Sequence, residues 1–175
     1  MAGESQEMPL VTSSVDLPSG VENQRWMFVV RALNKPGTLT DAAAVFSNRG
    51  VSLEGFLGSG IDTSSVEDGR LLLSFRATTA KKTLLKRSLQ RLPSVSQVNE
   101  YAFDDDRLRL VAVAQLSVDA QVTPTDALHV EMISSGDETN LLLLLTGRAV
   151  VVEGAITSLR QKGQLNDVVV SAITV

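Results

Sequence analysis

The sequence has 175 residues, of which 43% are hydrophobic, enough for a folded core, and this excludes a purely disordered linker. The 16 Lys and Arg against 20 Asp and Glu give a formal net charge of −4, which disfavours nucleic acid as a partner. The sequence has no cysteine and a single histidine, which excludes disulfides, thiolate zinc sites, cysteine nucleophiles and histidine-rich metal cages.

No segment of the sequence is typical of a membrane protein. The longest apolar run, residues 141–145, is far shorter than the roughly 20 residues that a membrane-spanning helix needs. The first residues also lack the basic and then apolar pattern of a signal peptide. We therefore expect a cytoplasmic protein with no membrane partner.

The chain begins with a segment that has no periodic pattern. Residues 1–24 mix Ser, Pro, Gly and Glu with scattered apolar positions, which predicts a flexible tail. Residues 26–33 are β-branched and aromatic and predict a strand. Pro36 and Gly37 follow, and they favour a tight turn because proline fixes φ and glycine permits positive φ.

A helix of about three turns is predicted after this turn. Leu39, Ala43 and Phe46 have helical spacing, Ala42 and Val45 extend the same face, and a glycine at position 50 is placed to end the helix. This pattern predicts Leu39 to be a core residue of the first turn.

The rest of the first half predicts two strands, a helix and a strand. Residues 51–57 and 70–78 are the first two strands, and the polar residues 62–69 suit a hairpin loop between them. A leucine stripe closed by proline marks the helix, and residues 95–103 form the last strand. The order β-α-β-β-α-β predicts an α+β, ferredoxin-like unit over residues 25–104.

The second half repeats part of the first, and we assign residues 105–175 to a second unit. A shift of 70 positions places three leucines, residues 71–73, over residues 141–143 and repeats the following helical stripe. Residues 117–127 contain a proline and no helical stripe, so the second unit is predicted to lack its first helix. The prediction is tandem ferredoxin-like units, of which the second is truncated.

Without its first helix, the second unit has a sheet face that its own helices cover only in part. The strands of this half are rich in Leu and Val, and one helix does not cover four strands. We therefore expect a homodimer, a higher oligomer or a second protein to pack there.

No catalytic constellation is found. His129 lies in a predicted strand without a nucleophile motif, so we interpret it as a structural or surface residue. The carboxylates at residues 104–106 and 137–138 lie in hydrophilic connections and are interpreted as solvated. We expect a protein that is not an enzyme and holds no metal or catalytic cofactor.

Two binding motifs are also set aside. The Gly-Ser-Gly at residues 58–60 does not lead from a strand into a helix and lacks a following Lys, so it is interpreted as a strand-end bulge or turn and not as a phosphate loop. Trp26, Phe28 and Phe75 are possible stacking residues for RNA, but the acidic pI and the leucine-rich third strand favour a core role.

The turn at residues 34–39 carries the strongest binding chemistry in the sequence. A helix N-terminus presents free N–H groups to a carboxylate, and Gly37 lets a ligand approach the backbone. The Asn34 amide suits either end of an amino acid. The alternative is an ordinary strand–helix turn in which Asn34 only caps locally.

At these residues the sequence resembles the ACT-domain family of small ligand-sensing modules. The run Asn-Lys-Pro-Gly-Thr-Leu at residues 34–39 matches the family signature of an acidic or amide residue and then Pro-Gly-x-Leu. A more specific resemblance is to the regulatory small subunits of acetohydroxyacid synthase (acetolactate synthase). It lies in residues 29–56, where Phe-Ser-Asn-Arg-Gly, an apolar residue and then Glu54 follow the helix, and it extends over about residues 25–116.

The resemblance implies where a ligand binds. In that family the feedback amino acid, usually valine, lies between the first loop of one subunit and the second strand of its neighbour. On this chain the implied ligand-binding residues are Asn34, Lys35, Pro36, Gly37, Thr38 and Leu39 of one subunit, with Ser52 and Leu53 of the other. Ser52 stands where the family usually has Asn, so a hydroxyl replaces an amide.

The resemblance also implies a function. We expect a non-catalytic regulatory subunit that senses a branched-chain amino acid, forms dimers and controls a catalytic large subunit in branched-chain amino-acid biosynthesis. The alternative is a stand-alone ACT-type sensor or scaffold that acts on another enzyme and binds no amino acid.

Overall fold

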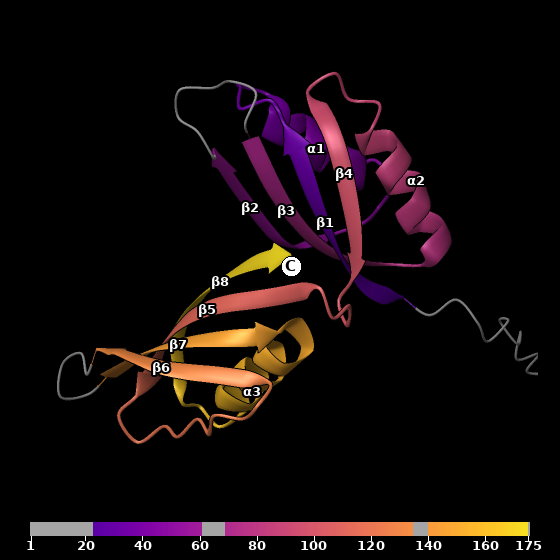
Figure 1. Ribbon diagram of the computed structural model, residues 1–175. Helices are drawn as coiled ribbons and strands as arrows, with labels where there is room; N and C mark the ends of the chain where they lie inside the picture. The colour runs from indigo at the N-terminus through magenta and orange to yellow at the C-terminus, as the bar shows by residue number, and fades with distance from the viewer. Residues whose placement is uncertain (1–22, 61–68, 135–139, 175) are drawn as a thin grey trace, which may run out of the picture.

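A computed structural model of the chain describes residues 23–60, 69–134 and 140–174 (Figure 1). It contains two four-stranded antiparallel sheets, one formed by the first half of the chain and one by the second. The expectations for the N-terminal tail, for the hairpin loop at residues 62–69 and for the carboxylates at residues 137–138 lie wholly or mostly outside the described residues.

The first unit has the predicted β-α-β-β-α-β order. Its sheet runs β2-β3-β1-β4, and both helices lie on one face of it (Figure 1). The elements are β1 Gln24–Ala32, α1 Thr38–Ser47, β2 Leu53–Gly60, β3 Gly69–Ala77, α2 Thr79–Leu89 and β4 Val95–Ala102.

Alternation along β1 builds the core of this unit. Phe28 is fully buried on the helix side, where it meets Phe46 of α1 and Phe75 of β3. The Phe28 and Phe75 rings lie edge to face with centroids 4.8 Å apart, a favoured aromatic geometry. Trp26 is also buried there and donates a hydrogen bond to the Ala77 carbonyl, so these aromatic residues are core residues and not a stacking surface.

Two predictions for the first unit are wrong in detail. Leu39 is 46% exposed, because the buried stripe of α1 is Thr38, Ala42, Val45 and Phe46 and leaves Leu39 on the flank. Strand β2 starts two residues later than predicted and continues to Gly60, so the Gly-Ser-Gly at residues 58–60 is strand and not a bulge or turn.

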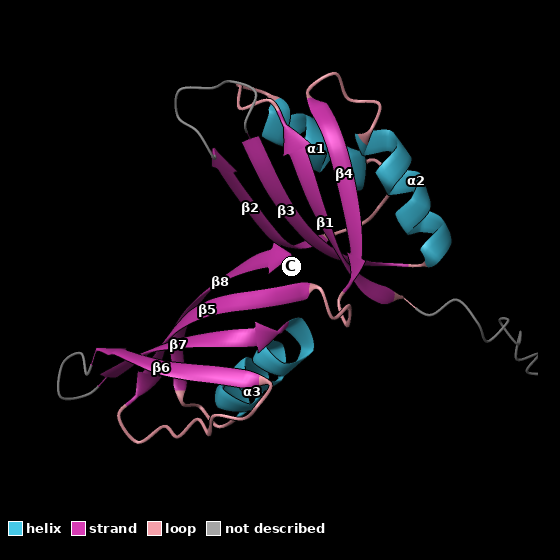
Figure 2. Ribbon diagram, in the orientation of Figure 1, coloured by secondary structure: helices cyan, strands magenta, loops and turns pink. Residues whose placement is uncertain are grey.

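The second unit repeats the topology with one helix fewer. Its strand order β6-β7-β5-β8 corresponds to β2-β3-β1-β4 of the first unit. Figure 2 shows a loop, without a helix, between β5 and β6, which confirms the predicted loss of the first helix. The tandem α+β fold class is therefore confirmed. The elements are β5 Leu108–Ser117, β6 Leu128–Ser134, β7 Asn140–Arg148, α3 Ala149–Gln161 and β8 Leu165–Thr174.

The chain itself covers part of the sheet face that the missing helix would cover. Ala120 and Val122 of the β5–β6 connection pack against the core of the second unit. Met27, Val29 and Leu72 belong to the same core cluster, and they come from the face of the first sheet that is opposite its helices. The expectation that another protein must cover this face is therefore too strong, because the β5–β6 connection supplies part of the cover.

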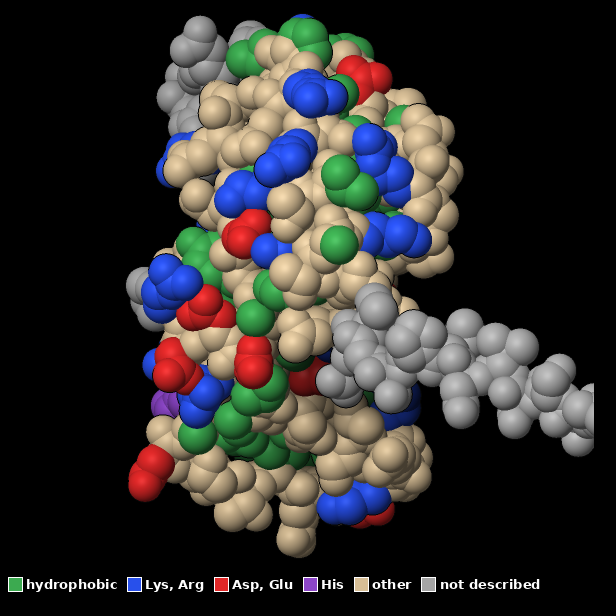
Figure 3. All heavy atoms as spheres, turned by 90° about the vertical axis from the view of Figure 1, so that its right-hand side faces the viewer, with side chains coloured by type: hydrophobic (Ala, Val, Ile, Leu, Met, Phe, Trp, Pro, Cys, Tyr) green, Lys and Arg blue, Asp and Glu red, His purple; other side chains and the backbone are tan. Residues whose placement is uncertain are grey.

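Apolar residues nevertheless remain at the surface of the second unit. Figure 3 shows hydrophobic side chains there, in the lower half of the molecule. Among the described residues, the large hydrophobic side chains that are exposed on the strands of this unit are Met132, Ile133, Val169, Val170 and Ile173.

Two further findings concern the described part of the chain. None of its helices is long and apolar enough to cross a membrane. Within the same residues, no group of three or more His, Cys, Asp and Glu side chains is placed to hold a metal ion.

Candidate functional site

The connection between β1 and α1 has an uncapped helix start. Gly37 is the N-cap of α1 and has φ of 90°, a left-handed conformation that glycine adopts at little cost. It has no side chain to accept from the first turn, so no side-chain hydrogen bond caps the helix. The N–H groups of this turn therefore favour an anionic group such as a carboxylate.

Thr38 brings a polar atom without a partner to the same place. The residue is 3% exposed, and its Oγ1 has no hydrogen-bond partner among the described residues. A buried hydroxyl without a partner costs about 1–3 kcal/mol. Thr38 is one of the residues that line a cavity of about 150 Å³, but its Oγ1 is itself buried and does not face that cavity openly.

Asn34 also lines this cavity and lies against the end of β2. A Cβ on Gly60 would lie 2.8 Å from the Asn34 side-chain nitrogen, and a Cβ on Gly69 would lie 3.3 Å from the Asn34 backbone nitrogen. Asn34 can occupy this place because both neighbours are glycines.

The cavity brings together only some of the predicted ligand-binding residues. Pro36 and Gly37 lie in the same connection but do not line it. Residues of β2 and β3 that the sequence analysis did not assign to the site complete the wall. The cavity is lined by Ala32, Leu33, Asn34, Lys35, Thr38, Leu39, Gly58, Ser59, Gly60, Gly69 and Leu71.

Glycines within strands are the signal that could have identified these additional residues. Gly58 and Gly60 lie in an edge strand, where glycine often marks a close approach of other groups. A Cβ on Gly58 would lie 3.1 Å from a methyl group of Leu39, so this position lets the leucine fold over β2.

Ser52 and Leu53 lie apart from this cavity in the same chain. They line a second, open concavity with Ala43, Phe46 and Gly50, next to the C-terminal end of α1. A single chain therefore does not bring the two halves of the predicted site together.

The other polar candidates are placed as surface residues. His129 is well exposed and lies 3.9 Å from a carboxylate oxygen of Glu131. Asp105 pairs with Arg107, whose side-chain hydrogen bonds lower the pKa of Asp105 to about 2. Asp106 pairs with Arg148. These contacts support the interpretation of residues 104–106 as a solvated connection.

A second charged group joins α2 to β4 on the helix face of the first unit. Lys82 is 7% exposed, lies 2.7 Å from a carboxylate oxygen of Glu100 and stacks on the Trp26 ring. Burial alone would raise the pKa of Glu100, but hydrogen bonds from Lys82 and Lys86 outweigh that effect and lower it. This group stabilises the fold and forms part of neither cavity described above.

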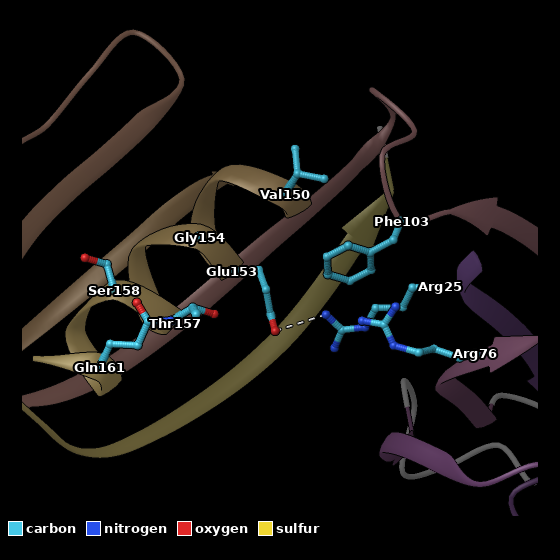
Figure 4. A pocket seen from close by; sticks show the side chains of 9 residues that line it. All are labelled: Arg25, Arg76, Phe103, Val150, Glu153, Gly154, Thr157, Ser158 and Gln161. Atoms are coloured by element: carbon cyan, nitrogen blue, oxygen red, sulfur yellow. Dashed lines mark ion pairs between the residues drawn. The ribbon is translucent and has the colours of Figure 1, made fainter. Parts of the chain in front are cut away.

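The boundary between the two units holds a third charged group, which we call the interunit cluster. It consists of Arg25, Glu54, Arg76 and Glu153, and it borders an open cavity of about 470 Å³ along α3 (Figure 4). Figure 4 shows Glu153 pointing from α3 toward Arg25, with the Phe103 ring beside the two arginines. The sequence analysis did not predict this cluster.

Comparisons with known proteins identify a shared fold. No model of a known protein family matches the sequence, and no curated protein matches it. The small subunit of acetolactate synthase from Thermotoga maritima superposes with a TM-score of 0.59 and 16% identity, over 87% of this chain and 98% of that chain.

Two other solved structures are less similar. An unknown protein from Galdieria sulphuraria has a TM-score of 0.41 and 12% identity over 88% of this chain and 99% of its own. The regulatory subunit of aspartate kinase from Thermus thermophilus, in a ligand-free form, has a TM-score of 0.39 and 11% identity over 81% of this chain and 95% of its own. Of the three, only the Thermotoga subunit is similar enough to describe a common fold, and at 16% identity the similarity shows the fold alone.

Proposed function

We propose that this protein is a non-catalytic regulatory subunit that binds a small amino acid, with valine or another branched-chain amino acid as the effector. The observation that carries the proposal is the start of α1, which no side chain caps, beside a small cavity that Asn34, Thr38 and Leu39 line. The N–H groups of the helix start and the Asn34 amide are complementary to the polar ends of an amino acid.

Each wall of the cavity suits one part of such a ligand. The N–H groups at the start of α1 would bind the carboxylate. The Asn34 amide oxygen would accept from the ammonium group, and Leu39 and Leu71 offer apolar surface to an aliphatic side chain.

The volume of this cavity, about 150 Å³, supports a site that two copies share. Small-molecule sites usually enclose about 300–1,000 Å³, so one chain offers only part of an enclosing wall. Leu39, Phe56 and Leu57 are exposed beside this cavity and along β2, which is an edge strand. In the proposed dimer these edges meet, and Ser52 and Leu53 of the second copy close the site.

We further propose a catalytic subunit of acetolactate synthase as the regulated partner, and the cytoplasm as the place of action. The support is the resemblance at residues 29–56 together with the fold shared with the small subunit from Thermotoga maritima. Co-purification of the tagged chain with such a subunit tests this part of the proposal. If the chain binds an amino acid but does not co-purify with the catalytic subunit, a sensor that acts on another enzyme is favoured.

A thermal-unfolding scan against each common amino acid at millimolar concentration tests the ligand. An amino acid that binds only the folded chain raises the melting temperature, and we expect a selective rise with valine, leucine or isoleucine. Asn34→Ala should abolish the rise with little change in the ligand-free melting temperature, because Asn34 is an exposed loop residue.

Asn99→Ala is the matched control, because Asn99 is on β4, at the opposite edge of the sheet from β2. It should leave the rise intact. A scan in which no amino acid raises the melting temperature, or in which Asn34→Ala retains the full rise, contradicts the proposed site.

A further inference from the structure

We infer that Arg25 mechanically couples the start of β2, where the proposed effector site is closed, to helix α3 of the second unit. The inference concerns how occupancy of the site is passed on, and its regulatory meaning rests on the proposed function. The coupling itself depends on contacts between Arg25, Glu54 and Glu153, which are present in a single chain.

An irregularity in β2 is the first element of this coupling. Leu53 is opposite Phe75, and Gly55 is opposite Ser74, so two steps along β2 correspond to one step along β3. Glu54 is the extra residue of this β-bulge. Bulges re-aim side chains, and the Glu54 carboxylate contacts arginines of both β1 and β3.

These two arginines need a carboxylate between them. Arg25 of β1 and Arg76 of β3 are direct cross-strand partners, and like charges in that position are destabilising. One oxygen of Glu54 lies 2.7 Å from Arg25 Nε, and the other accepts a hydrogen bond of 2.8 Å from Arg76 Nε. Glu54 therefore neutralises both arginines and ties Arg25 to β2 through an ion pair.

Arg25 then reaches into the second unit. Its Nη1 lies 3.0 Å from a carboxylate oxygen of Glu153 on α3, and its guanidinium lies over the Phe103 ring, 4.0 Å from the centroid. The Arg25 side chain is only 20% exposed, so these charge interactions are less screened than at an open surface. Arg25 is thus paired with Glu54 of β2 on one side and with Glu153 of α3 on the other, and Figure 4 shows the second of these pairs.

The path from the proposed ligand to this guanidinium is short. Ser52 and Leu53 are the residues that the second copy contributes to the proposed site, and Glu54 is the next residue in the chain. A displacement of this strand start moves the Glu54 carboxylate, and Arg25 must follow it or lose the ion pair. The open cavity beside α3 leaves the helix room to respond.

A double-mutant cycle on the ligand-free chain tests the coupling. Glu54→Gln, Glu153→Gln and the double variant are unfolded thermally and compared with wild type. If both carboxylates act through one guanidinium, the lowering of the melting temperature in the double variant differs from the sum of the two single effects. Additive effects would mean that strand and helix are independent, and they would overturn the inference.

Hydrogen exchange locates the effect. Glu54→Gln, a change in the first unit, should raise amide exchange several-fold in α3 of the second unit. Val98→Ala is the matched control, because it weakens the core of the first unit without touching the interunit cluster. Unchanged exchange of α3 in Glu54→Gln, or an equal rise in Val98→Ala, would also overturn the inference.

Addition of valine separates this inference from the proposed function. In wild type, valine should change the exchange of α3, and Glu153→Gln should still bind valine but lose that change. Absence of valine binding in wild type would contradict the proposed effector. The double-mutant cycle and the hydrogen-exchange comparison, both measured without ligand, would still decide whether Arg25 couples the two units. Valine binding with an unaltered response of α3 in Glu153→Gln would overturn the coupling alone.

Discussion

Leu39 shows how strongly one residue's role depends on its orientation on the helix. Its spacing from Ala43 and Phe46 suggests a core position, yet Thr38 occupies the buried first-turn position and Leu39 lies on the flank over Gly58. We therefore expect Leu39→Ala to lower the free energy of unfolding by less than about 1 kcal/mol. Chemical denaturation measures this effect.

Leu85→Ala is the comparison for Leu39, because Leu85 is fully buried on the neighbouring helix. It should cost about 2–5 kcal/mol through the cavity that it leaves. Equal losses in the two variants would contradict the exposed placement of Leu39. The same Leu39→Ala variant should weaken amino-acid binding, because Leu39 lines the proposed site.

Residues of the candidate site were predictable to different degrees. Asn34, Thr38 and Leu39 could be identified because they lie in one short run whose motif has a chemical reason. The contribution of Gly58 and Gly60 was not predictable, because it depends on where β2 ends and on which loop lies against it. The lack of a hydrogen-bond partner for the Thr38 hydroxyl was also not predictable from the sequence, because the burial of a single oxygen depends on tertiary packing.

Between elements, the Lys82–Glu100 pair fixes α2 to β4 and makes this contact sensitive to pH. The pKa of Glu100 is lowered from the ordinary value of 4.5 by the two lysines, despite a burial effect that raises it. A depressed carboxyl pKa contributes stability that is fully present above about pH 4.5 and is lost as the pH falls through the folded-state pKa.

Glu100→Gln should therefore lower the free energy of unfolding at neutral pH by about 1–3 kcal/mol, because the buried Lys82 loses its partner. The difference from wild type should shrink as the pH falls below about 4.5. Urea denaturation across this range measures it, with the exposed Glu131→Gln as control. A difference that stays constant with pH would show that the pair does not act through its charge.

Elements were more predictable than residues. The order of strands and helices could be predicted because hydrophobic periodicity survives in each element, and the lost helix could be predicted because residues 117–127 lack a stripe. The end of β2 was misplaced because Gly58 and Gly60 are typical of turns, whereas here pairing with β3 keeps them extended. The conformational preferences of single residues carry no information about where a partner strand lies.

At the scale of the molecule, the internal repeat predicts two related units but not how they join. The shared core of Met27, Val29 and Leu72 with the second unit and the Arg25–Glu153 ion pair connect residues far apart in sequence. No periodic signal marks such contacts, because each residue also fits a strand or helix pattern by itself. The arrangement around the proposed boundary at residues 104–105 therefore required the structure.

If two copies of the chain share one amino-acid site, as proposed, mixing two subunit variants should restore binding that each variant has lost. Asn34→Ala removes the loop half of the site, and Ser52→Trp blocks the β2 half at an exposed position. In a symmetric dimer, a heterodimer of the two variants contains one site with both changes and one site with neither.

Valine binding is measured by titration calorimetry on each variant and on their equilibrated equal mixture. Neither variant alone should bind valine. The mixture should recover about a quarter of the wild-type sites, because about half of the dimers are mixed and each mixed dimer has one intact site of two. A mixture that recovers no binding, or a Ser52→Trp chain that binds valine normally by itself, would contradict a site shared between two copies.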